Sequence, residues 1–230
     1  MVALIYSDFY MIEPSLAEEN YLKAIFHLAQ HTEKVSTRAI AQHMDTKDSS
    51  VTSMLRKLSD KALIHYEKRY GVNMTESGNT AALTIIRRHR LWEVFLVDKL
   101  GFKWDEVHEL AEQLEHIQSP KLLEKLDHYL GSPTVDPHGD PIPDASGKMV
   151  HRSHILLSDA ELNTPFRLVR VKDDSSDFLQ YLDLRGLQIG THLQVIERIT
   201  YDNSLTLNVT QQGRIHISQK VAENLLVSVI

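Results

Sequence analysis

Two stretches in the middle of the chain carry histidine and carboxylate side chains at helical spacing. The first stretch has His89 and Glu93, and the second has His108, Glu112, Glu115 and His116. Side chains that are four, seven or eight positions apart lie on one face of an α-helix. Imidazole nitrogens and carboxylate oxygens bind divalent metal ions. Two helices whose donor faces meet would therefore form a metal site.

The alternative is that these donors form ordinary pairs on solvated helices. Glu and His four residues apart are common there and attract each other weakly. In this sequence, however, the donors border apolar residues of the kind that form a core, such as Ala111, Leu114 and Ile86. Carboxylates at the edge of a core lose hydration, and a divalent cation compensates that loss. Six donors on two helices exceed what a surface pair needs, so a metal site stays open beside the alternative of ordinary pairs.

The composition narrows the chemistry of such a site. The 230 residues include no cysteine, which excludes disulfides, thiolate metal ligands and cysteine nucleophiles. The remaining donors are imidazole, carboxylate, amide, carbonyl and thioether groups. This set favours Mn²⁺ or Fe²⁺ over metals that require thiolates, although imidazole also suits Zn²⁺. A chain of this length forms one large domain or two modest ones.

The sequence has no feature of a membrane or exported protein. No apolar run reaches the roughly 18 residues that a membrane-spanning helix needs. The first 14 residues are largely apolar but carry Asp8 and Glu13 and lack a basic start, so they do not resemble a signal peptide. We therefore expect a cytoplasmic protein that does not bind membranes.

Residues 36–75 have the proportions of a winged helix-turn-helix, a DNA-binding unit. A first short helix, capped by Ser36, is followed after a three-residue break by a second helix capped by Asp48. The alternating residues 63–75 around Gly71 predict a β-hairpin, which would be the wing.

The second of these helices has an apolar face and a polar, basic face. Val51, Leu55 and Leu58 recur at buried spacing, whereas the opposite side carries hydroxyls, Arg and Lys. Such groups contact phosphates and base edges. The net charge of −6 does not oppose DNA binding, because basic residues gather here. The residues expected to contact DNA are Ser36, Thr37, Lys47, Ser49, Ser50, Thr52, Ser53, Arg56, Lys57, Lys68 and Arg69. A helical scaffold with a merely solvated polar face is the open alternative.

Helical periodicity continues to about residue 131 and is followed by short β-like segments. Further helices are predicted at 21–31, at 76–100 with Thr75 as its cap, at 105–117 and at 120–131. Residues 131–149 are rich in Pro and Gly, which is typical of a loop. Strands are predicted at 166–172, 192–199, 204–209, 214–218 and 225–230, with a short helix at 177–184. Several short strands of this kind indicate a small barrel.

These elements predict a fold that is mainly α-helical with a small all-β domain. The expected domains are 1–75, with a winged helix-turn-helix, 76–149, which is helical, and 150–230, which is the barrel. Residues 1–13 would be an extension whose role the sequence does not indicate. Ala62 stands where a left-handed residue, often Gly, follows a helix, and this conformation costs Ala on the order of 1 kcal/mol.

Several motifs, in order along most of the chain, resemble the diphtheria-toxin-repressor family, which includes the manganese transport regulators. The similarity extends from about residue 14 to the end of the chain. Besides the helix-turn-helix, the motifs are Glu19–Ile25, Arg88–Leu96, Val107–Glu109, Glu115–His116 and Asp136–Pro143. The resemblance implies a winged helix-turn-helix, a helical metal-binding and dimerisation domain, and a C-terminal SH3-like barrel.

The resemblance also implies a principal metal site. Its ligands would be His89, Glu112, Glu115 and His116, completed by Asn20. Asn20 stands where iron-type members carry Met and manganese-type members Asp. Glu112 stands where iron-type members have Cys and manganese-type members Glu, which favours Mn²⁺, with Fe²⁺ next. Lys23 stands where a manganese-type member offers Glu, which argues against a binuclear site of that type.

A second, ancillary site is implied by the same resemblance. Its ligands would be Glu93, His108, Asp136, His138 and one of Asp174 or Asp177. Asp136 stands where relatives often have Cys.

The function implied by the resemblance is metal-dependent transcriptional repression. A homodimer loaded with Mn²⁺ or Fe²⁺ would bind a palindromic operator in double-stranded DNA and control genes for metal uptake. The residues leave two alternatives open. One is a metal-independent winged-helix regulator that responds to another ligand, and the other is a metallohydrolase in which a Glu activates metal-bound water.

Overall fold

The computed structural model describes residues 14–30, 32–150 and 153–230. The predicted extension at 1–13 lies outside these residues. The chain divides into two compact units, one up to Ile85 and one from Ile86 to Ile230. The long helix α4, Glu76–Leu100, contributes to both units. The domain boundaries at 75 and 149 stay a prediction.

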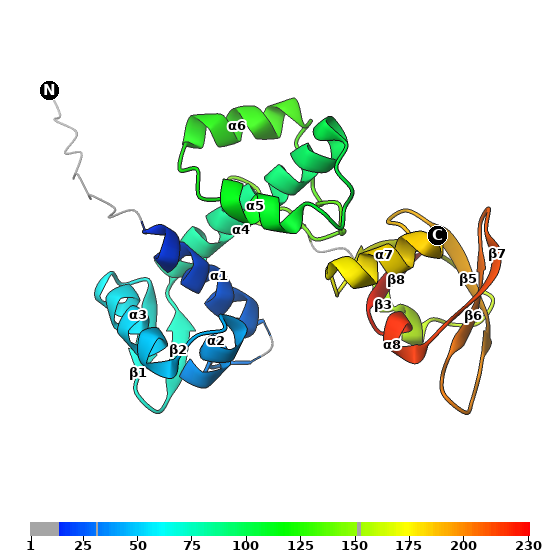
Figure 1. Ribbon diagram of the computed structural model, residues 1–230, viewed down its shortest axis with the longest axis horizontal. Helices are drawn as coiled ribbons and strands as arrows, with labels where there is room; N and C mark the ends of the chain where they lie inside the picture. The colour runs from blue at the N-terminus through cyan, green and yellow to red at the C-terminus, as the bar shows by residue number, and fades with distance from the viewer. Residues whose placement is uncertain (1–13, 31, 151–152) are drawn as a thin grey trace, which may run out of the picture. The chain divides into compact units, whose positions relative to one another are not determined.

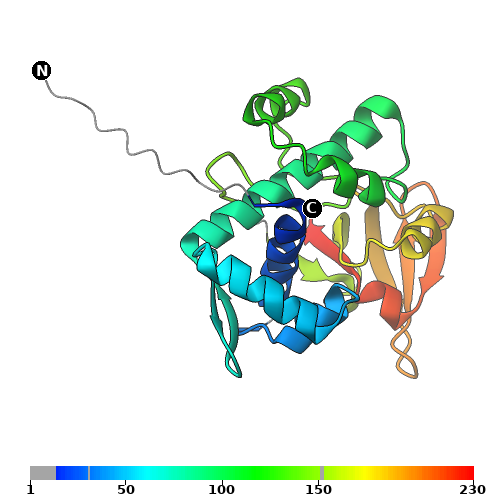
Figure 2. The ribbon, with the colours of Figure 1, turned by 60° about the vertical axis from the view of Figure 1, so that its left-hand side comes forward.

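The N-terminal unit consists of three helices and a hairpin. These are α1 (Leu16–Ala29), α2 (Thr37–His43), α3 (Asp48–Asp60), β1 (Ile64–Glu67) and β2 (Gly71–Met74). The helices pack around a core that includes Leu22, Ile25, Ile40, Val51, Leu55 and Leu58. The hairpin of β1 and β2 extends beyond the helices of this unit, as a wing would (Figures 1 and 2). The predicted winged helix-turn-helix is therefore present.

The predicted helix caps are correct at two positions and wrong at a third. Ser36 Oγ accepts a hydrogen bond from Ala39 N at 3.1 Å, and Thr75 Oγ1 accepts one from Gly78 N at 3.0 Å. Asp48, in contrast, is the first residue of α3, whose N-cap Lys47 makes no side-chain hydrogen bond. Asp48 still carries a negative charge in the first turn, where the helix dipole favours it.

The connection between α3, the hairpin and α4 is compact. Ala62 has a φ of +54°, as predicted, and its carbonyl oxygen accepts hydrogen bonds from the hydroxyls of Thr75 at 2.8 Å and Ser77 at 3.0 Å. These bonds offset part of the cost of the left-handed conformation. At Gly78, an added Cβ would lie 1.8 Å from Leu63 O. Glycine therefore allows the first turn of α4 to contact the backbone at the start of the hairpin.

The second unit begins with the rest of α4 and two further helices, α5 (His108–Leu114) and α6 (Pro120–Tyr129). The prediction of a helix at 105–117 was too long at both ends. The chain first makes a turn in which the Glu106 carboxylate accepts a hydrogen bond from Lys103 N at 2.9 Å. At the other end Glu115 is the C-cap and still has helical φ and ψ, so its side chain continues the donor face. Ser119 caps α6 by accepting from Leu122 N.

The rest of this unit is a six-stranded antiparallel sheet in the order β3-β8-β4-β5-β6-β7. Its strands are β3 (Ile155–Leu156), β4 (Pro165–Val171), β5 (His192–Arg198), β6 (Leu205–Val209), β7 (Gly213–Ile217) and β8 (Leu225–Val229). The short helices are α7 (Ser176–Leu184), α8 (Gln219–Ala222) and the 3₁₀ turn η1 (Leu157–Asp159). One hydrophobic core takes side chains from β4 to β8 and from α7, so the sheet is wrapped around it.

The predicted fold class, mainly helical with a small all-β domain, is confirmed. The strands lie within a residue or two of their predicted ends, whereas β3, η1 and α8 were not predicted because each is only two to four residues long. None of the described helices is long and apolar enough to span a bilayer.

Candidate metal centre

The imidazole of His89, on α4, lies between two carboxylates. Its Nδ1 is 2.6 Å from Glu115 Oε2 at the end of α5, and its Nε2 is 3.0 Å from Glu93 Oε1, one turn along α4. All three side chains are buried. The four-residue spacing on α4 and the short α5 beside it bring these groups together.

Three groups of metal-binding donors share members around this histidine. In each group one ligand atom per residue lies within 4.8 Å of the others. The groups are His89–Glu112–Glu115, His89–Glu93–His108 and Glu93–Asp136–His138. His89 and Glu93 each belong to two groups. The donors therefore form one continuous cluster, with a first end at Glu112 and Glu115 and a second end at Asp136 and His138.

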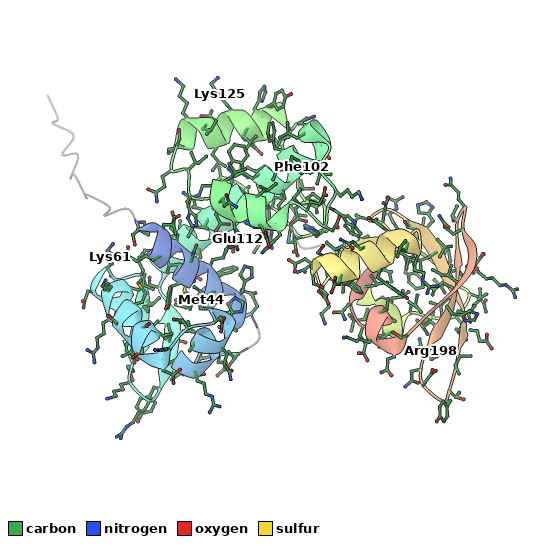
Figure 3. All side chains as sticks on the ribbon, viewed as in Figure 1. Met44, Lys61, Phe102, Glu112, Lys125 and Arg198 are labelled. Carbon is green, nitrogen blue, oxygen red and sulfur yellow. The ribbon has the colours of Figure 1, made fainter. Side chains whose placement is uncertain are left out.

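The first end of the cluster contains the predicted principal ligands of the second unit. Glu115 is fully buried, and its Oε1 lies 3.8 Å from His116 Nε2. Glu112 lies on α5 (Figure 3), and its side chain is half-buried. The structure thus brings His89, Glu112 and Glu115 together, and their role as metal ligands stays a prediction. Asn20 belongs to α1 of the N-terminal unit, and its role as a ligand stays a prediction.

The second end contains the predicted ancillary ligands. His138 Nδ1 lies 3.8 Å from Glu93 Oε2 and 3.9 Å from Asp136 Oδ1. His108 Nδ1 lies 3.7 Å from Glu93 Oε1 and 3.9 Å from Asp174 Oδ2. Of the two acidic candidates near α7, Asp174 thus approaches the cluster. Neither Asp174 nor Asp177 belongs to the three donor groups found among the described residues.

Interactions between buried charges shift the pKa values of Glu93, Asp136 and His138 at the second end. Burial raises the pKa of Asp136 to about 7, and the nearby carboxylates of Glu93 and Asp140 add to this effect. Burial alone would lower the pKa of His138, but Glu93 and Asp136 outweigh it and raise the pKa to about 9. Burial would raise the pKa of Glu93, yet the neighbouring imidazoles of His108, His138 and His89 keep it well below its usual range.

This electrostatic arrangement fits a divalent cation. The carboxylates of Glu93, Asp136 and Asp140 converge at the second end. Protons on the imidazoles and on Asp136 limit the repulsion between them. Metal ligands bind in their deprotonated forms, so a cation can take over the role of those protons. All donors in the cluster are oxygen or nitrogen atoms, which suits Mn²⁺ or Fe²⁺.

Sequence reasoning missed the residues that hold the second end in place. Arg90, one position after His89, donates a hydrogen bond to Pro141 O at 2.5 Å and lies 3.5 Å from Asp136 Oδ2. Arg87 donates to Pro143 O at 2.6 Å. The sequence feature that could have indicated this contact is the group of three arginines within residues 87–90. Guanidinium groups on one helix can donate hydrogen bonds to the carbonyl oxygens of a Pro-rich loop.

The residues predicted to contact DNA lie mainly on the exposed face of α3 and on the wing. Val51, Leu55 and Leu58 are fully buried, as predicted for the opposite face. Of the predicted set, Ser36, Lys47, Ser49, Ser50, Ser53, Arg56, Lys57, Lys68 and Arg69 are exposed, and Thr37 and Thr52 are half-buried. Thr52 Oγ1 donates to Asp48 O at 2.9 Å, which leaves its oxygen as an acceptor. DNA contact by these residues stays a prediction.

Three family models match successive parts of the chain. The N-terminal DNA-binding domain of iron-dependent repressors matches residues 15–72, and the metal-binding and dimerisation domain of the same repressors matches residues 75–144. A FeoA domain matches residues 155–229. A solved structure of a manganese-dependent transcriptional repressor in complex with manganese is 33% identical to this chain. That match covers 93% of this chain and 100% of the other, with a TM-score of 0.82.

The chain belongs to the diphtheria-toxin-repressor family of iron- and manganese-dependent transcriptional repressors. The iron-dependent repressor IdeR of Mycobacterium tuberculosis is 32% identical over 125 residues, which are 54% of each chain. The chain thus spans about half the length of this relative. The diphtheria toxin repressor of Corynebacterium diphtheriae is 25% identical over 201 residues, covering 83% of this chain and 87% of the relative. The family predicted from the sequence motifs is thereby confirmed.

Family membership gives the donor cluster its context. The second match places His89, Glu93, Glu112, Glu115, Asp136 and His138 within a metal-binding and dimerisation domain. The N-terminal match covers α1 to α3 and most of the wing. The FeoA match covers the sheet and also the segment between β4 and α7 from which Asp174 approaches His108, and it agrees with the predicted SH3-like domain.

Proposed function

We propose that this protein is a DNA-binding repressor that responds to Mn²⁺ or Fe²⁺ and controls genes for metal uptake. The observation that carries the proposal is the continuous donor cluster around His89, inside a region that matches a metal-binding domain. The relatives named for iron or manganese dependence support the same choice of metals.

The proposal assigns two metal sites to each chain. His89, Glu112, Glu115 and His116 would hold the first ion, with Asn20 as a ligand from α1. Glu93, His108, Asp136, His138 and Asp174 would hold the second. The carboxylate of Glu112 favours Mn²⁺, because Mn²⁺ prefers oxygen ligands over the softer sulfur ligands.

A bound ion neutralises carboxylates that otherwise repel each other. His89 contacts the carboxylates of Glu115 and Glu93 through its two ring nitrogens. When an ion occupies the first site, the carboxylates and imidazoles of α4 and α5 are fixed around it. A ligand from α1 would then favour one arrangement of the winged helix-turn-helix over a broader ensemble, which is a population shift.

The DNA-binding surface of the proposal is the exposed face of α3 with the wing. Arg56 and Lys57 would contact phosphates near the recognition helix, and Lys68 and Arg69 would contact them from the turn between β1 and β2. Two such units in a homodimer would read the two half-sites of a palindromic operator, spaced by about one turn of DNA.

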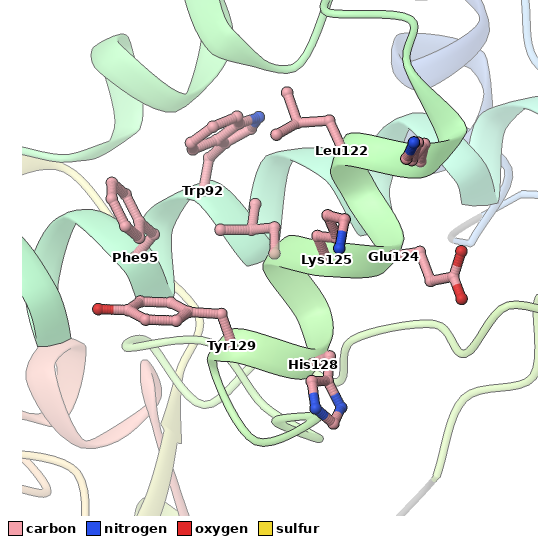
Figure 4. Close-up of a pocket in the computed structure, with 9 residues that line it drawn as sticks. Trp92, Phe95, Leu122, Glu124, Lys125, His128 and Tyr129 are labelled. Atoms are coloured by element: carbon pink, nitrogen blue, oxygen red, sulfur yellow. The ribbon is translucent and has the colours of Figure 1, made fainter.

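We assign the homodimer contact to an apolar hollow of about 730 Å³ between α4 and α6. It is lined by Trp92, Phe95, Leu122 and Tyr129 (Figure 4), together with Leu126 and several polar residues. Leu122 and Tyr129 are exposed although they are large and apolar. The occupant we propose is a second copy of the chain, because the hollow lies inside the match to a dimerisation domain.

The test of the proposed function is operator binding titrated with metal. A binding sequence is first selected from random DNA with Mn²⁺-loaded protein. Affinity for it is then measured with Mn²⁺, Fe²⁺, Zn²⁺ and chelator. We expect tight binding with Mn²⁺ or Fe²⁺, loss of binding in chelator, and loss of the metal response in Glu112→Gln.

The matched control for that variant is Glu109→Gln, on the exposed side of the same helix. It should respond to metal as the wild type does. Full-strength DNA binding in chelator would contradict the proposal and favour a regulator that does not depend on metal.

A further inference from the structure

The turn at residues 136–140 belongs to the second donor group and also packs against the C-terminal sheet. His138 points its Nδ1 toward Glu93 Oε2 at 3.8 Å, while its carbonyl oxygen accepts a hydrogen bond from Val171 N of β4 at 3.0 Å. In the same turn, Asp140 Oδ1 lies 2.5 Å from Arg170 Nη2, also on β4. One turn therefore serves both the donor cluster and the sheet.

Gly139 makes the closest approach in this contact. Its φ is +87°, and an added Cβ would lie 2.0 Å from Val169 O and 2.7 Å from Arg170 Cα. Val169 lies at the irregularity where the pairing of β4 with β8 shifts between Leu168 and Arg170. Such bulges commonly occur beside functional sites, where they redirect the backbone. Glycine is needed here for both its conformation and its lack of a side chain.

Trp104 makes a second contact between the same two parts. Its side chain is buried in the hydrophobic core of the C-terminal sheet, although the residue lies just after α4. Its ring stacks on that of His138, with centroids 6.1 Å apart and an interplanar angle of 14°. Its carbonyl oxygen is 2.9 Å from His138 Nε2.

This contact determines which nitrogen of His138 is available to a cation. A carbonyl oxygen only accepts hydrogen bonds, so Nε2 must be the protonated nitrogen in the neutral ring. Nδ1, which faces Glu93 and Asp136, then carries the free electron pair. A carbonyl partner on the second nitrogen is the usual way in which a protein orients a metal-binding histidine.

We propose that Gly139 and Trp104 are positioning residues that couple the second metal site to the docking of the C-terminal sheet. The inference rests on the second site of the proposed function. Docking of β4 against the 136–140 turn holds the ligands in place. Because coupling between two equilibria is reciprocal, a cation held by Glu93 and His138 stabilises the same docking.

The first test is Mn²⁺ binding by the full chain carrying Glu112→Gln, so that the second site is observed. Adding Gly139→Ala should weaken Mn²⁺ binding by at least about tenfold, as changes behind metal ligands commonly do. The matched control is Gly131→Ala, because Gly131 has a similar φ of +78° but nothing within 4 Å of an added Cβ. It should bind Mn²⁺ as the background does. Equal affinity in the Gly139→Ala and Gly131→Ala proteins would overturn the inference.

A second variant pair covers the case in which Gly139→Ala does not fold. Arg170→Gln removes the ion pair with Asp140 from the side of the sheet, and Arg170→Lys keeps the charge. The first should weaken Mn²⁺ binding and the second should restore most of it. If neither Arg170→Gln nor Arg170→Lys weakens Mn²⁺ binding, the result counts against the coupling.

The second test measures docking itself, through hydrogen exchange of the Val171 amide. Mn²⁺ should slow this exchange in the wild type and leave it unchanged in Glu93→Gln. Mn²⁺ affinity is again measured in the Glu112→Gln chain. If adding Glu93→Gln leaves that affinity unchanged, the second site of the proposed function is wrong. If Glu93→Gln weakens Mn²⁺ binding but Mn²⁺ does not change the exchange of the Val171 amide in the wild type, the second site is supported and only the coupling is wrong.

Discussion

His89 and Glu115 join α4 to α5 through a short contact, with 2.6 Å between Nδ1 and Oε2. The other nitrogen of the same ring lies 3.0 Å from Glu93 Oε1. An imidazole that binds a metal through one nitrogen commonly gives its second N–H to a carboxylate. His89 is therefore placed to serve one metal site directly and the other indirectly.

The first prediction follows from this shared position. His89→Gln should weaken Mn²⁺ binding at both sites, whereas Glu112→Gln should weaken only the first. Calorimetric titration of each variant gives the number of sites and their affinities. A His89→Gln protein that loses one site and keeps the other at wild-type affinity would show that the ring serves a single ion.

The second prediction concerns the interaction of α3 with phosphates. Arg56→Ala should weaken binding to the selected operator and lower the slope of log K against log salt by about 0.9 for each phosphate that the variant no longer neutralises. The slope is measured by fluorescence anisotropy between low and moderate salt. Lys220→Ala, exposed on α8, is the control for a general decrease in positive charge. An unchanged slope in Arg56→Ala would exclude a phosphate contact there.

The third prediction concerns the hollow between α4 and α6. Leu122→Glu should convert the dimer to a monomer in light scattering, because a carboxylate buried in a dimer interface would lose its hydration without a partner. Leu184→Glu is the control, since Leu184 is also exposed and lies on α7, away from the hollow. A Leu122→Glu protein that stays dimeric would assign dimerisation to another surface.

The fourth prediction concerns the pH dependence of stability. Burial alone would raise the pKa of Glu18, but the hydrogen bond from Lys61 Nζ at 2.7 Å and that from Ser15 N outweigh it and lower the pKa. A lowered pKa means that this carboxylate stabilises the fold above its unfolded pKa of about 4.3. The stabilisation is lost as the pH falls through the folded pKa.

The variant that tests this pair is Lys61→Met. Its free energy of unfolding in urea should fall by about 1 kcal/mol at pH 7, and the difference from the wild type should shrink below about pH 4. Lys57→Met, at an exposed position one turn earlier on α3, should change stability little at either pH. A Lys61 effect that persists unchanged at low pH would mean that packing of its methylene groups, and not the carboxylate, is responsible.

Local signals were sufficient for much of the fold. Ser36 and Thr75 were recognisable caps because each precedes an apolar periodicity, and Ala62 was recognisable because it follows the last periodic residue of a helix. The ends of α5 were not predictable in this way. Asp105 and Glu106 both suit a helix start, yet α5 begins only at His108, after the turn in which the Glu106 carboxylate accepts a hydrogen bond from Lys103 N.

The donor cluster was predictable only in part. The spacing of His89 and Glu93 shows that they share a helix face, but it does not show that Glu115 meets the same ring. Asp136 and His138 entered through the resemblance to a family, since no periodicity links a loop to α4. The contacts of Trp104 and Gly139 with the C-terminal sheet depend on tertiary packing, which no local pattern records.

The close approach at Gly78 has a consequence for how movement passes through the N-terminal unit. The helix that carries His89 starts with its backbone against Leu63 O, where the hairpin begins, and no side chain separates them. Side chains between packed elements absorb small displacements by changing rotamer, and here that adjustment is missing. A rotation of the first turn of α4 about its axis would therefore displace the wing directly, backbone against backbone.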